Sequence, residues 1–463
     1  MVNVLVLDNV DLAGVEILKE HFSVDVINAI NPDELQGIIK NYDALVVRSQ
    51  TKVTENIINA GDRLKVIGRA GVGVDNIDVG AATRKGIVVV NSPDGNTVAA
   101  AEHTLALIMS LARYIPSANQ SLKNGEWKRK EYTGVELYNK VLGIIGLGRI
   151  GSHIARVCKA MGMKLIAFDP YINKKIADEI GVEVVELEQL FTEADFITIH
   201  VPLTAETKNL INKDSMKKMK NSVRIVNCSR GGIINESDLV EALENNVIGG
   251  AALDVFAQEP LTDSQLQKVQ EKLIITPHLG ASTQEAQINV AIDVAEQITS
   301  VLNGEGVKNA VNLPGMEVPP ELKPYLGIAV KIGSFVGQLS NAQNIKNIEI
   351  KYQGELASKN IKPLTVAVIK GILSPILKET VNYVNATTVA KDRGINVEEI
   401  KSSEETNYKC MITVRATFEH GSNLVSGTIV SDQEERIVQI DEYNISFMPE
   451  GKLLVTKNTR RGS

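Results

Sequence analysis

Three ionisable side chains in the middle of the chain are of the types that can move a proton beside a bound carboxylate. Arg230 is followed by two glycines, Glu259 precedes a proline, and His278 follows a proline. The planar guanidinium of Arg230 can bind both oxygens of a carboxylate. A carboxylate such as Glu259 orients a neighbouring imidazole and raises its pKa, which keeps that imidazole useful as a proton carrier near neutral pH. The trio is typical of a site that oxidises or reduces a 2-hydroxy acid.

A glycine-rich loop before the trio predicts a dinucleotide site. Gly146, Gly148 and Gly151 come directly after the apolar run 141–145 and open a predicted helix. Glycines let the backbone approach a pyrophosphate, whose charge is then stabilised at the helix amino terminus. Asp169 ends the next predicted strand, where a carboxylate can accept from both ribose hydroxyls and would repel a 2′-phosphate. We therefore expect NAD rather than NADP as the cofactor.

The choice of His278 as the proton carrier depends on its neighbours. His200 and His278 each follow a predicted strand, and open α/β sheets bind ligands at the carboxyl ends of their strands. We favour His278 because Glu259 offers it a carboxylate, and we interpret His200 as a structural or cofactor-side residue. His103 lies within a long apolar helix and is interpreted as a packing or interface group. Asp254 could reach a nicotinamide carboxamide or cap a helix, and its spacing does not decide between them.

Further cations follow predicted strands near the amino terminus. Arg48 and Ser49 come after the run 44–47, and Arg69 stands two residues before Gly71. A plain 2-hydroxy acid needs only one arginine, so two more cations at strand ends suggest a second anion on the substrate, such as a phosphate. The alternative is that both arginines are solvated or held in ion pairs.

The elements that must position these residues alternate as strands and helices. Apolar runs separated by helical patterns predict two parallel sheets, each covered on both faces, in doubly wound, Rossmann-like or flavodoxin-like lobes. The first predicted strands are 2–8, 24–27, 44–47, 65–68 and 87–90. The second set is 141–145, 164–169, 182–185, 196–200, 223–227, 250–253 and 273–276. Long helices are predicted over 97–112 and 282–303, the first as a connector between the lobes.

The pattern changes after the turn residues of 312–315 and 319–320. The runs 346–352, 409–418, 424–430 and 436–440 alternate like antiparallel strands, and helices are predicted over 325–339 and 364–377. This pattern predicts a separate α+β domain without recognisable catalytic motifs, for which a regulatory or assembly role is expected.

The bulk composition limits the class of protein. The 463 residues are 44% hydrophobic with a net charge of −7, and they contain no dense basic block, so we expect no nucleic-acid partner. Three widely spaced cysteines exclude a disulfide framework or zinc knuckle, so we expect no metal and a reducing, cytoplasmic location. No run approaches the roughly 20 apolar residues of a membrane span, so no membrane partner is expected.

Several longer motifs carry a resemblance to a known family. They are Gly68 to Asn76, Gly146 to Gly151, Asn227 to Gly232 and Pro277 to Thr283. With these motifs in order over nearly its whole length, the chain resembles the D-isomer-specific 2-hydroxyacid dehydrogenases, in particular those acting on 3-phosphoglycerate. The resemblance implies NAD-dependent oxidation of 3-phosphoglycerate to 3-phosphohydroxypyruvate, the first step of L-serine biosynthesis.

The resemblance also implies roles for individual residues. Arg230 would bind the substrate carboxylate, Glu259 would tune the imidazole, and His278 would exchange the proton. The residues implied at the cofactor are Gly146, Gly148, Arg149, Ile150, Gly151, Asp169, Cys228, Ser229, Arg230, Asp254, His278, Leu279, Gly280 and Ala281. Those implied at the substrate are Arg48, Ser49, Arg69 and Gly71.

The family's organisation implies the domains and the assembly. Residues 1–97 and 280–308 would form a discontinuous substrate-binding domain around an NAD-binding domain at 98–279, followed by an intervening domain at 312–450. The family assembles through the region around Trp127, which implies a homo-oligomer, a dimer or a tetramer. Residues 453–459 resemble the first strand of a serine-binding ACT domain, so 451–463 would be its remnant and serine inhibition through it would be absent.

Two alternative functions share parts of this pattern. The same trio would serve a dehydrogenase for 2-oxoglutarate, hydroxypyruvate or glyoxylate. A non-catalytic, NAD-sensing corepressor could be built on the same fold, although the acidic balance of the chain argues against it.

Overall fold

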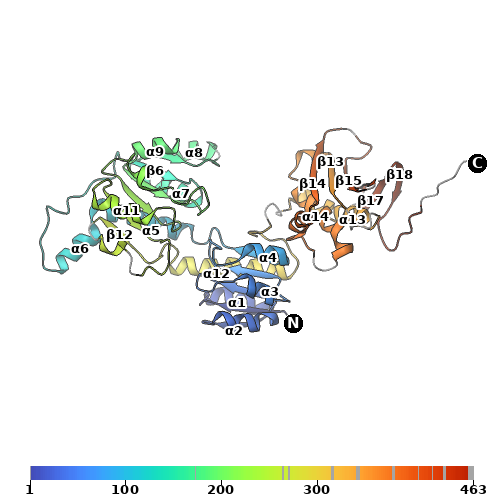
Figure 1. Cartoon of the computed structure of the whole chain (residues 1–463), viewed down its shortest axis with the longest axis horizontal. Helices are drawn as coiled ribbons and strands as arrows, with labels where there is room; N and C mark the ends of the chain where they lie inside the picture. The colour runs from blue at the N-terminus through green and yellow to red at the C-terminus, as the bar shows by residue number, and fades with distance from the viewer. Residues whose placement is uncertain are drawn as a thin grey trace, which may run out of the picture. The chain divides into compact units, whose positions relative to one another are not determined.

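The chain divides into two compact units (Figure 1). The computed structural model describes residues 2–172, 174–262, 265–269, 272–313, 318–339, 345–377, 381–404, 406–419, 421–430 and 434–456. One unit is Met1–Ser92 with Ala291–Ser463, and the other is Pro93–Val290. Three sheets lie within these units, in blue, green and orange-red in chain order.

The amino-terminal sheet is parallel, with the strand order β2-β1-β3-β4-β5. Its strands are β1 (Asn3–Leu7), β2 (Ser23–Ile27), β3 (Ala44–Val47), β4 (Val66–Arg69) and β5 (Val88–Asn91). The helices are α1 (Leu12–His21), α2 (Pro32–Ile38), α3 (Glu55–Ala60) and α4 (Val79–Lys85). This order is the doubly wound, flavodoxin-like one, and the all-buried β3 explains why the run 44–47 shows no polar alternation.

Helix α12 (Gln284–Leu302) returns to this sheet with the part that follows Ala291. A Cβ on Gly14 would lie 2.5 Å from the Ala291 carbonyl oxygen, and one on Gly68 would lie 2.5 Å from a Val294 methyl. The two glycines therefore allow the close approach of α12 to α1 and β4. The prediction that residues 282–303 form a helix is confirmed.

The central sheet is parallel throughout, with the order β12-β11-β10-β9-β6-β7-β8. Its strands are β6 (Val141–Ile145), β7 (Lys164–Phe168), β8 (Glu183–Val184), β9 (Phe196–Ile199), β10 (Arg224–Asn227), β11 (Gly250–Leu253) and β12 (Leu273–Ile275). The helices are α5 (Thr97–Arg113), α6 (Ile115–Lys123), α7 (Arg149–Ala160), α8 (Lys174–Ile180), α9 (Leu187–Glu193), α10 (Lys213–Met216) and α11 (Glu236–Glu244). The strand order reverses between β6 and β9, the kind of place where such sheets bind ligands.

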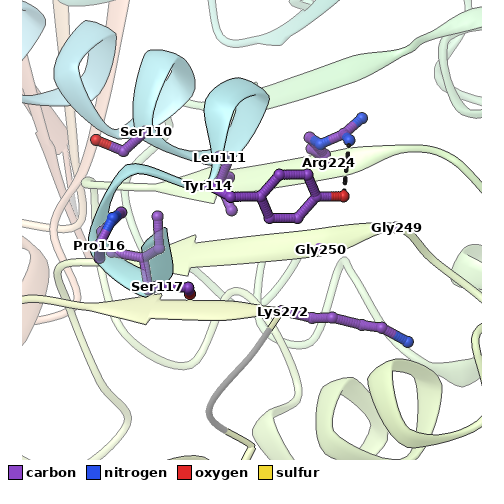
Figure 2. A pocket seen from close by; sticks show the side chains of 10 residues that line it. Ser110, Leu111, Tyr114, Pro116, Ser117, Arg224, Gly249, Gly250 and Lys272 are labelled. Atoms are coloured by element: carbon purple, nitrogen blue, oxygen red, sulfur yellow. Dashed lines mark hydrogen bonds between the residues drawn. The ribbon is translucent and has the colours of Figure 1, made fainter. Parts of the chain in front are cut away.

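A buried arginine fixes the opposite, amino edge of the central sheet (Figure 2). Arg224 is 8% exposed, and its guanidinium carbon lies 5.9 Å from the Tyr114 ring and 5.6 Å from the Phe196 ring. Tyr114 has φ 53° and joins α5 to α6, so this cation–π contact ties the bend between the helices to the sheet. The cavity beside it measures about 10 Å³, room for one water molecule at most.

The carboxyl-terminal sheet has the order β14-β13-β15-β16-β17-β18. Its strands are β13 (Asn347–Gly354), β14 (Asn396–Ser402), β15 (Cys410–Phe418), β16 (Gly421–Val430), β17 (Glu434–Ile440) and β18 (Tyr443–Phe447). The four predicted strands β13, β15, β16 and β17 pair antiparallel as expected. Strand β14, which was not predicted, pairs in parallel with β13. Both β14 and β18 escaped the sequence analysis because they are edge strands with mostly exposed side chains, which leave no apolar alternation.

Helices α13 (Lys323–Leu339) and α14 (Lys362–Leu377) pack against this sheet, and α15 (Ala386–Asp392) follows them. A Cβ on Gly333 would lie 2.2 Å from the Val368 carbonyl oxygen, so glycine lets the two long helices approach closely. Short 3₁₀ turns occur at Ile39–Asn41, Gln265–Lys268, Pro320–Leu322 and Glu355–Ser358.

Two sequence predictions fall partly on residues outside the description. The turn at Asn312 to Gly315 is described only through residue 313. The strand predicted for 453–459 is not found in its described part, since residues 452–456 form no regular element, and 457–463 lie outside the described residues. Among the described residues, no helix has the length and apolarity to cross a membrane, and no group of three or more His, Cys, Asp or Glu could hold a metal ion.

Candidate active site

The predicted catalytic and cofactor residues of the second unit gather at one edge of the central sheet. Because all seven strands are parallel, their carboxyl ends meet there. The residues that follow β6, β7, β10, β11 and β12 include, in that order, Gly146, Asp169, Arg230, Asp254 and His278.

The glycine loop after β6, residues 146–151, surrounds a space that side chains leave open; we call this loop the glycine cradle. Gly146 has φ 92°, and a Cβ there would lie 2.6 Å from the His200 carbonyl oxygen. A Cβ on Gly151 would lie 2.2 Å from the Gly146 carbonyl oxygen, so α7 begins tightly against the loop. A Cβ on Gly148 would meet nothing within 4 Å, and no side chain caps α7 there. Open space at an uncapped helix amino terminus fits a pyrophosphate.

Asp169 binds the backbone of this cradle. Its carboxylate accepts from the Leu147 amide at 2.9 Å and from the Tyr171 amide at 2.9 Å. The end of β7 thereby fixes the glycine loop, and each oxygen keeps further lone pairs that could accept from a ribose.

His278 and Glu259 form a bonded pair. His278 Nδ1 lies 2.7 Å from Glu259 Oε2, and Glu259 Oε1 accepts from the Phe256 amide at 3.0 Å. The hydrogen bond to Glu259 raises the pKa of His278, against the opposing effects of burial and of the Arg230 charge. Burial opposes ionisation of Glu259, yet its bond with His278 lowers its pKa below the ordinary value. The imidazole side chain is 50% exposed, so a substrate can reach it.

Arg230 lies in the tight turn after β10, close enough for its charge to lower the pKa of His278. Asn227 is 1% exposed, and its side-chain Nδ2 donates to the Arg230 carbonyl oxygen at 2.8 Å. A Cβ on Gly231 would lie 1.8 Å from the Phe256 carbonyl oxygen, so only glycine lets this turn pack against the segment before Glu259. The structure therefore brings the predicted trio together. Asn227 belongs to the sequence motif but was given no role there, and its burial as the last residue of β10 reveals one.

His200 and Cys228 have little acid–base capacity near neutral pH. Burial lowers the pKa of His200 to about 3, and its Nε2 lies 2.8 Å from the Thr198 hydroxyl. Burial also raises the pKa of the Cys228 thiol to about 12, so the thiolate is scarce at pH 7. The interpretation of His200 as structural or cofactor-side agrees with its neutral imidazole.

Asp254 anchors the loop that carries His278. Its side chain is fully buried, and its carboxylate accepts from the amides of Leu279 and Gly280, each at 2.8 Å. Burial disfavours the charged form, but these bonds and those from His103 and Thr276 lower the pKa of Asp254. The suggestion that Asp254 caps a helix is therefore wrong, because the amides it binds belong to a loop.

The predicted substrate residues lie at the carboxyl edge of the amino-terminal sheet. Arg48 follows β3, and Arg69 ends the neighbouring strand β4. Asp8 accepts from the amides of Arg48 at 2.9 Å and Thr51 at 3.0 Å, so it shapes the loop that contains Ser49. Asp8 is 4% exposed with φ 64°, and sequence reasoning missed it because a strand-ending aspartate has no distinctive spacing.

Gly71 leaves room for the Arg69 side chain. Gly71 has φ 150°, and a Cβ there would lie 1.5 Å from Arg69 Nη1. Any larger residue at position 71 would therefore displace the guanidinium. The two residues act as one structural unit, in keeping with the prediction that both lie at the substrate.

Family profiles match two parts of the chain. The profile described as the NAD-binding domain of D-isomer-specific 2-hydroxyacid dehydrogenases matches residues 105–280. The profile described as the intervening domain of D-3-phosphoglycerate dehydrogenase matches residues 321–441. The cofactor is therefore NAD, in agreement with the open glycine cradle.

Whole proteins of the same kind are similar over nearly the full chain. D-3-phosphoglycerate dehydrogenase from Synechocystis sp. is 54% identical over 98% of this chain and 82% of its own length. The enzyme of that name from Bacillus subtilis is 46% identical over 98% of this chain and 86% of its own length. The structure of Aquifex aeolicus D-lactate dehydrogenase with NAD and lactic acid is 28% identical and superposes with a TM-score of 0.60, covering 67% of this chain and 99% of that one. The chain belongs to the D-3-phosphoglycerate dehydrogenase family of NAD-dependent 2-hydroxyacid dehydrogenases.

Proposed function

We propose that this protein oxidises 3-phosphoglycerate to 3-phosphohydroxypyruvate with NAD, the step that opens L-serine biosynthesis. The observation that carries the proposal is the bonded pair of His278 and Glu259, 2.7 Å apart, with the charge of Arg230 acting on the same imidazole. A proton carrier and a carboxylate-binding cation beside a glycine cradle are what oxidation of a 2-hydroxy acid requires.

Each member of the trio has a distinct role in this proposal. Arg230 binds the substrate carboxylate through its two-pronged guanidinium. His278 Nε2, the ring nitrogen not bonded to Glu259, accepts the proton of the 2-hydroxyl as the C–H bond breaks. Glu259 fixes the ring orientation and stabilises the imidazolium that forms.

The residues that would hold NAD surround the glycine cradle. The backbone of Gly146, Gly148, Arg149, Ile150 and Gly151 would hold the pyrophosphate, and Asp169 the ribose. When bound, NAD supplies the acceptor for the hydride that leaves the substrate carbon. We assign Cys228, Ser229, Asp254, Leu279, Gly280 and Ala281 to the same site, because they follow the neighbouring strands.

The phosphate of the substrate is proposed to bind Arg48, Ser49, Arg69 and the backbone at Gly71. Two cations on adjacent parallel strands suit a second anion, and Gly71 preserves the place of one of them. This specificity distinguishes the proposal from a general dehydrogenase for hydroxypyruvate, 2-oxoglutarate or glyoxylate.

The test compares NADH oxidation with phosphohydroxypyruvate, hydroxypyruvate and 2-oxoglutarate. We expect kcat/KM for the phosphorylated substrate to exceed that for hydroxypyruvate by about a hundredfold or more, since a phosphate held by charged donors contributes several kcal/mol. Arg69→Gln and Gly71→Ala should both reduce this ratio about tenfold or more. Arg84→Gln, at an exposed arginine paired with Glu55, is the matched control and should leave the ratio unchanged. Equal turnover of both substrates by the wild type would refute the proposed specificity.

We further propose that the protein is a homo-oligomer, a dimer or a tetramer, formed through α6 and the chain that follows it. Ile115, Leu122, Trp127 and Tyr138 are 55%, 58%, 82% and 65% exposed, an apolar set that favours a partner surface. Figure 1 shows this segment, in cyan, extending away from the sheet of its own unit.

The assembly prediction is tested by changing the most exposed of these side chains. Trp127→Glu should shift the mass measured by light scattering toward that of one chain. Tyr171→Glu, at an isolated side chain that is 95% exposed on a different loop, should leave the mass unchanged. A wild-type protein of monomeric mass would rule the assembly out.

We propose that 1–97 with 280–308 bind the substrate, that 98–279 bind NAD and that 312–450 serve regulation or assembly. The free state of Cys158, Cys228 and Cys410 supports a reducing, cytoplasmic location.

A further inference from the structure

A second histidine–carboxylate pair lies behind the His278 loop. His103 Nε2 is 3.2 Å from Asp254 Oδ1 and 3.2 Å from the Thr276 hydroxyl, and its side chain is 20% exposed. The apolar sequence of α5 predicts a packing or interface role for His103. The structure instead places it in a hydrogen-bonded cluster.

The donors in this cluster determine where the His103 proton lies. Thr276 Oγ1 has a single hydrogen, which it donates to Asp254 Oδ1 at 2.6 Å. The contact between His103 Nε2 and the same hydroxyl oxygen therefore requires Nε2 to be the donor. Since Asp254 Oδ1 is only an acceptor, the Nε2–H group of His103 is shared between Thr276 and Asp254.

The His103 bond differs in kind from the other bonds to Asp254. In the described part of the chain, the Asp254 carboxylate accepts from the Leu279 and Gly280 amides, from Thr276 and from His103. The first three donors belong to the loop or to the end of β12. Only His103 comes from another element, α5, so its imidazole links the anchor of the loop to a long helix.

The loop needs an anchor because His278 has an uncommon backbone conformation. Its φ is 55°, in the left-handed region that only a few per cent of non-glycine residues adopt. Its amide donates to the Asp254 carbonyl oxygen at 2.9 Å, and the next two amides donate to the Asp254 carboxylate. Rotation of that carboxylate would release both amides and allow the loop to relax.

We propose that His103 is a positioning residue for the reaction. Its Nε2–H holds the Asp254 carboxylate to α5 and thereby keeps loop 276–280 in the conformation that directs His278 Nδ1 to Glu259. This inference rests on the role of His278 as the proton carrier, and it assigns to His103 no contact with substrate or cofactor.

The test compares two replacements of His103 that differ in hydrogen bonding. His103→Phe keeps a ring of similar size but has no donor, and His103→Gln keeps an N–H at a similar reach. We expect His103→Phe to lower kcat about tenfold or more while KM for phosphohydroxypyruvate changes less than about threefold, because the carrier is misplaced rather than lost. His103→Gln should recover most of the rate. His21→Phe, at an exposed histidine ending α1, is the matched control.

Hydrogen exchange provides a readout that does not depend on activity. In His103→Phe, peptides covering 276–280 should exchange their amides faster than in the wild type, whereas His21→Phe should not change them. Thr276→Val removes the shared hydroxyl with little change of shape and should also speed the exchange of these amides. It replaces His103→Phe in the test if that variant does not fold.

Three results would overturn the inference. The first is a wild-type rate and exchange pattern in His103→Phe. The second is an equal loss of rate in the Phe and Gln variants, which would mean that His103 acts only through its packing. The third is unchanged exchange in Thr276→Val. Failure of the underlying function is distinguished by His278→Gln, since that variant would then retain activity whatever the His103 variants do.

Discussion

Replacement of His278 by glutamine should lower kcat about a thousandfold. The variant keeps a polar side chain of similar length but has no group that accepts and releases a proton near pH 7, and general acid–base catalysis contributes about 10²–10⁴. KM for the substrate should change little, because the variant keeps Arg230, the proposed carboxylate-binding residue. The measurement is NADH oxidation with phosphohydroxypyruvate, and His21→Gln is the control. A loss of less than about fivefold would contradict the role of His278.

The companion variant Glu259→Gln tests the cause of the His278 pKa. The bond with Glu259 is the largest influence raising that pKa, so removing the charge of Glu259 should lower the pKa of His278. Reduction of the keto acid needs protonated His278, and its rate falls as pH rises through this pKa; in the variant the fall should come at lower pH. Oxidation needs the neutral imidazole, so its rise with pH should also move to lower pH. An unmoved pH profile would mean that Glu259 does not tune His278.

Replacement of Arg230 by glutamine is the second large effect expected. Loss of two charge-assisted hydrogen bonds to the substrate carboxylate should lower kcat/KM by about a thousandfold, at about 1.5–3 kcal/mol for each bond. Arg230→Lys keeps the charge but loses the planar pair of N–H donors, and it should recover only about tenfold of that loss. Because the Arg230 charge opposes protonation of His278, the pKa of His278 should also rise in the glutamine variant.

The matched control for Arg230 is Arg156→Gln, at an exposed position on α7. It removes one positive charge from the same unit without touching the turn after β10. Wild-type kinetics in this control and a large loss in Arg230→Gln would locate the effect at the carboxylate site. Similar, small effects in both variants would contradict it.

The sequence predicted most strands of the two parallel sheets to within one or two residues. Strands β3, β6 and β11 match their predicted runs because buried parallel strands are short, apolar and bounded by turn residues. Strands β14 and β18 were missed for the opposite reason, since their side chains are mostly exposed and the pairing that defines them comes from distant partners.

The candidate site also has features that the sequence predicted and features that it did not. The chemical types of Arg230, Glu259 and His278 and their places after strands were readable, because the order of elements brings such residues to one edge of a parallel sheet. The roles of Asn227, Asp8 and His103 were not readable. Asp8 and His103 bond to residues far away in the chain, as when His103 on α5 meets Asp254 after β11, and Asn227 bonds within a turn whose shape is known only from the structure.

The sequence by itself determined the reaction class, because catalytic side chains must have particular chemistry and the glycines must permit particular backbone paths. Only the tertiary structure decided what holds those side chains in place. The bond from His278 to Glu259 and the anchoring of its loop by Asp254 are set by distances of a few ångströms. Such distances follow from packing among residues far apart in the chain, and no local pattern encodes them.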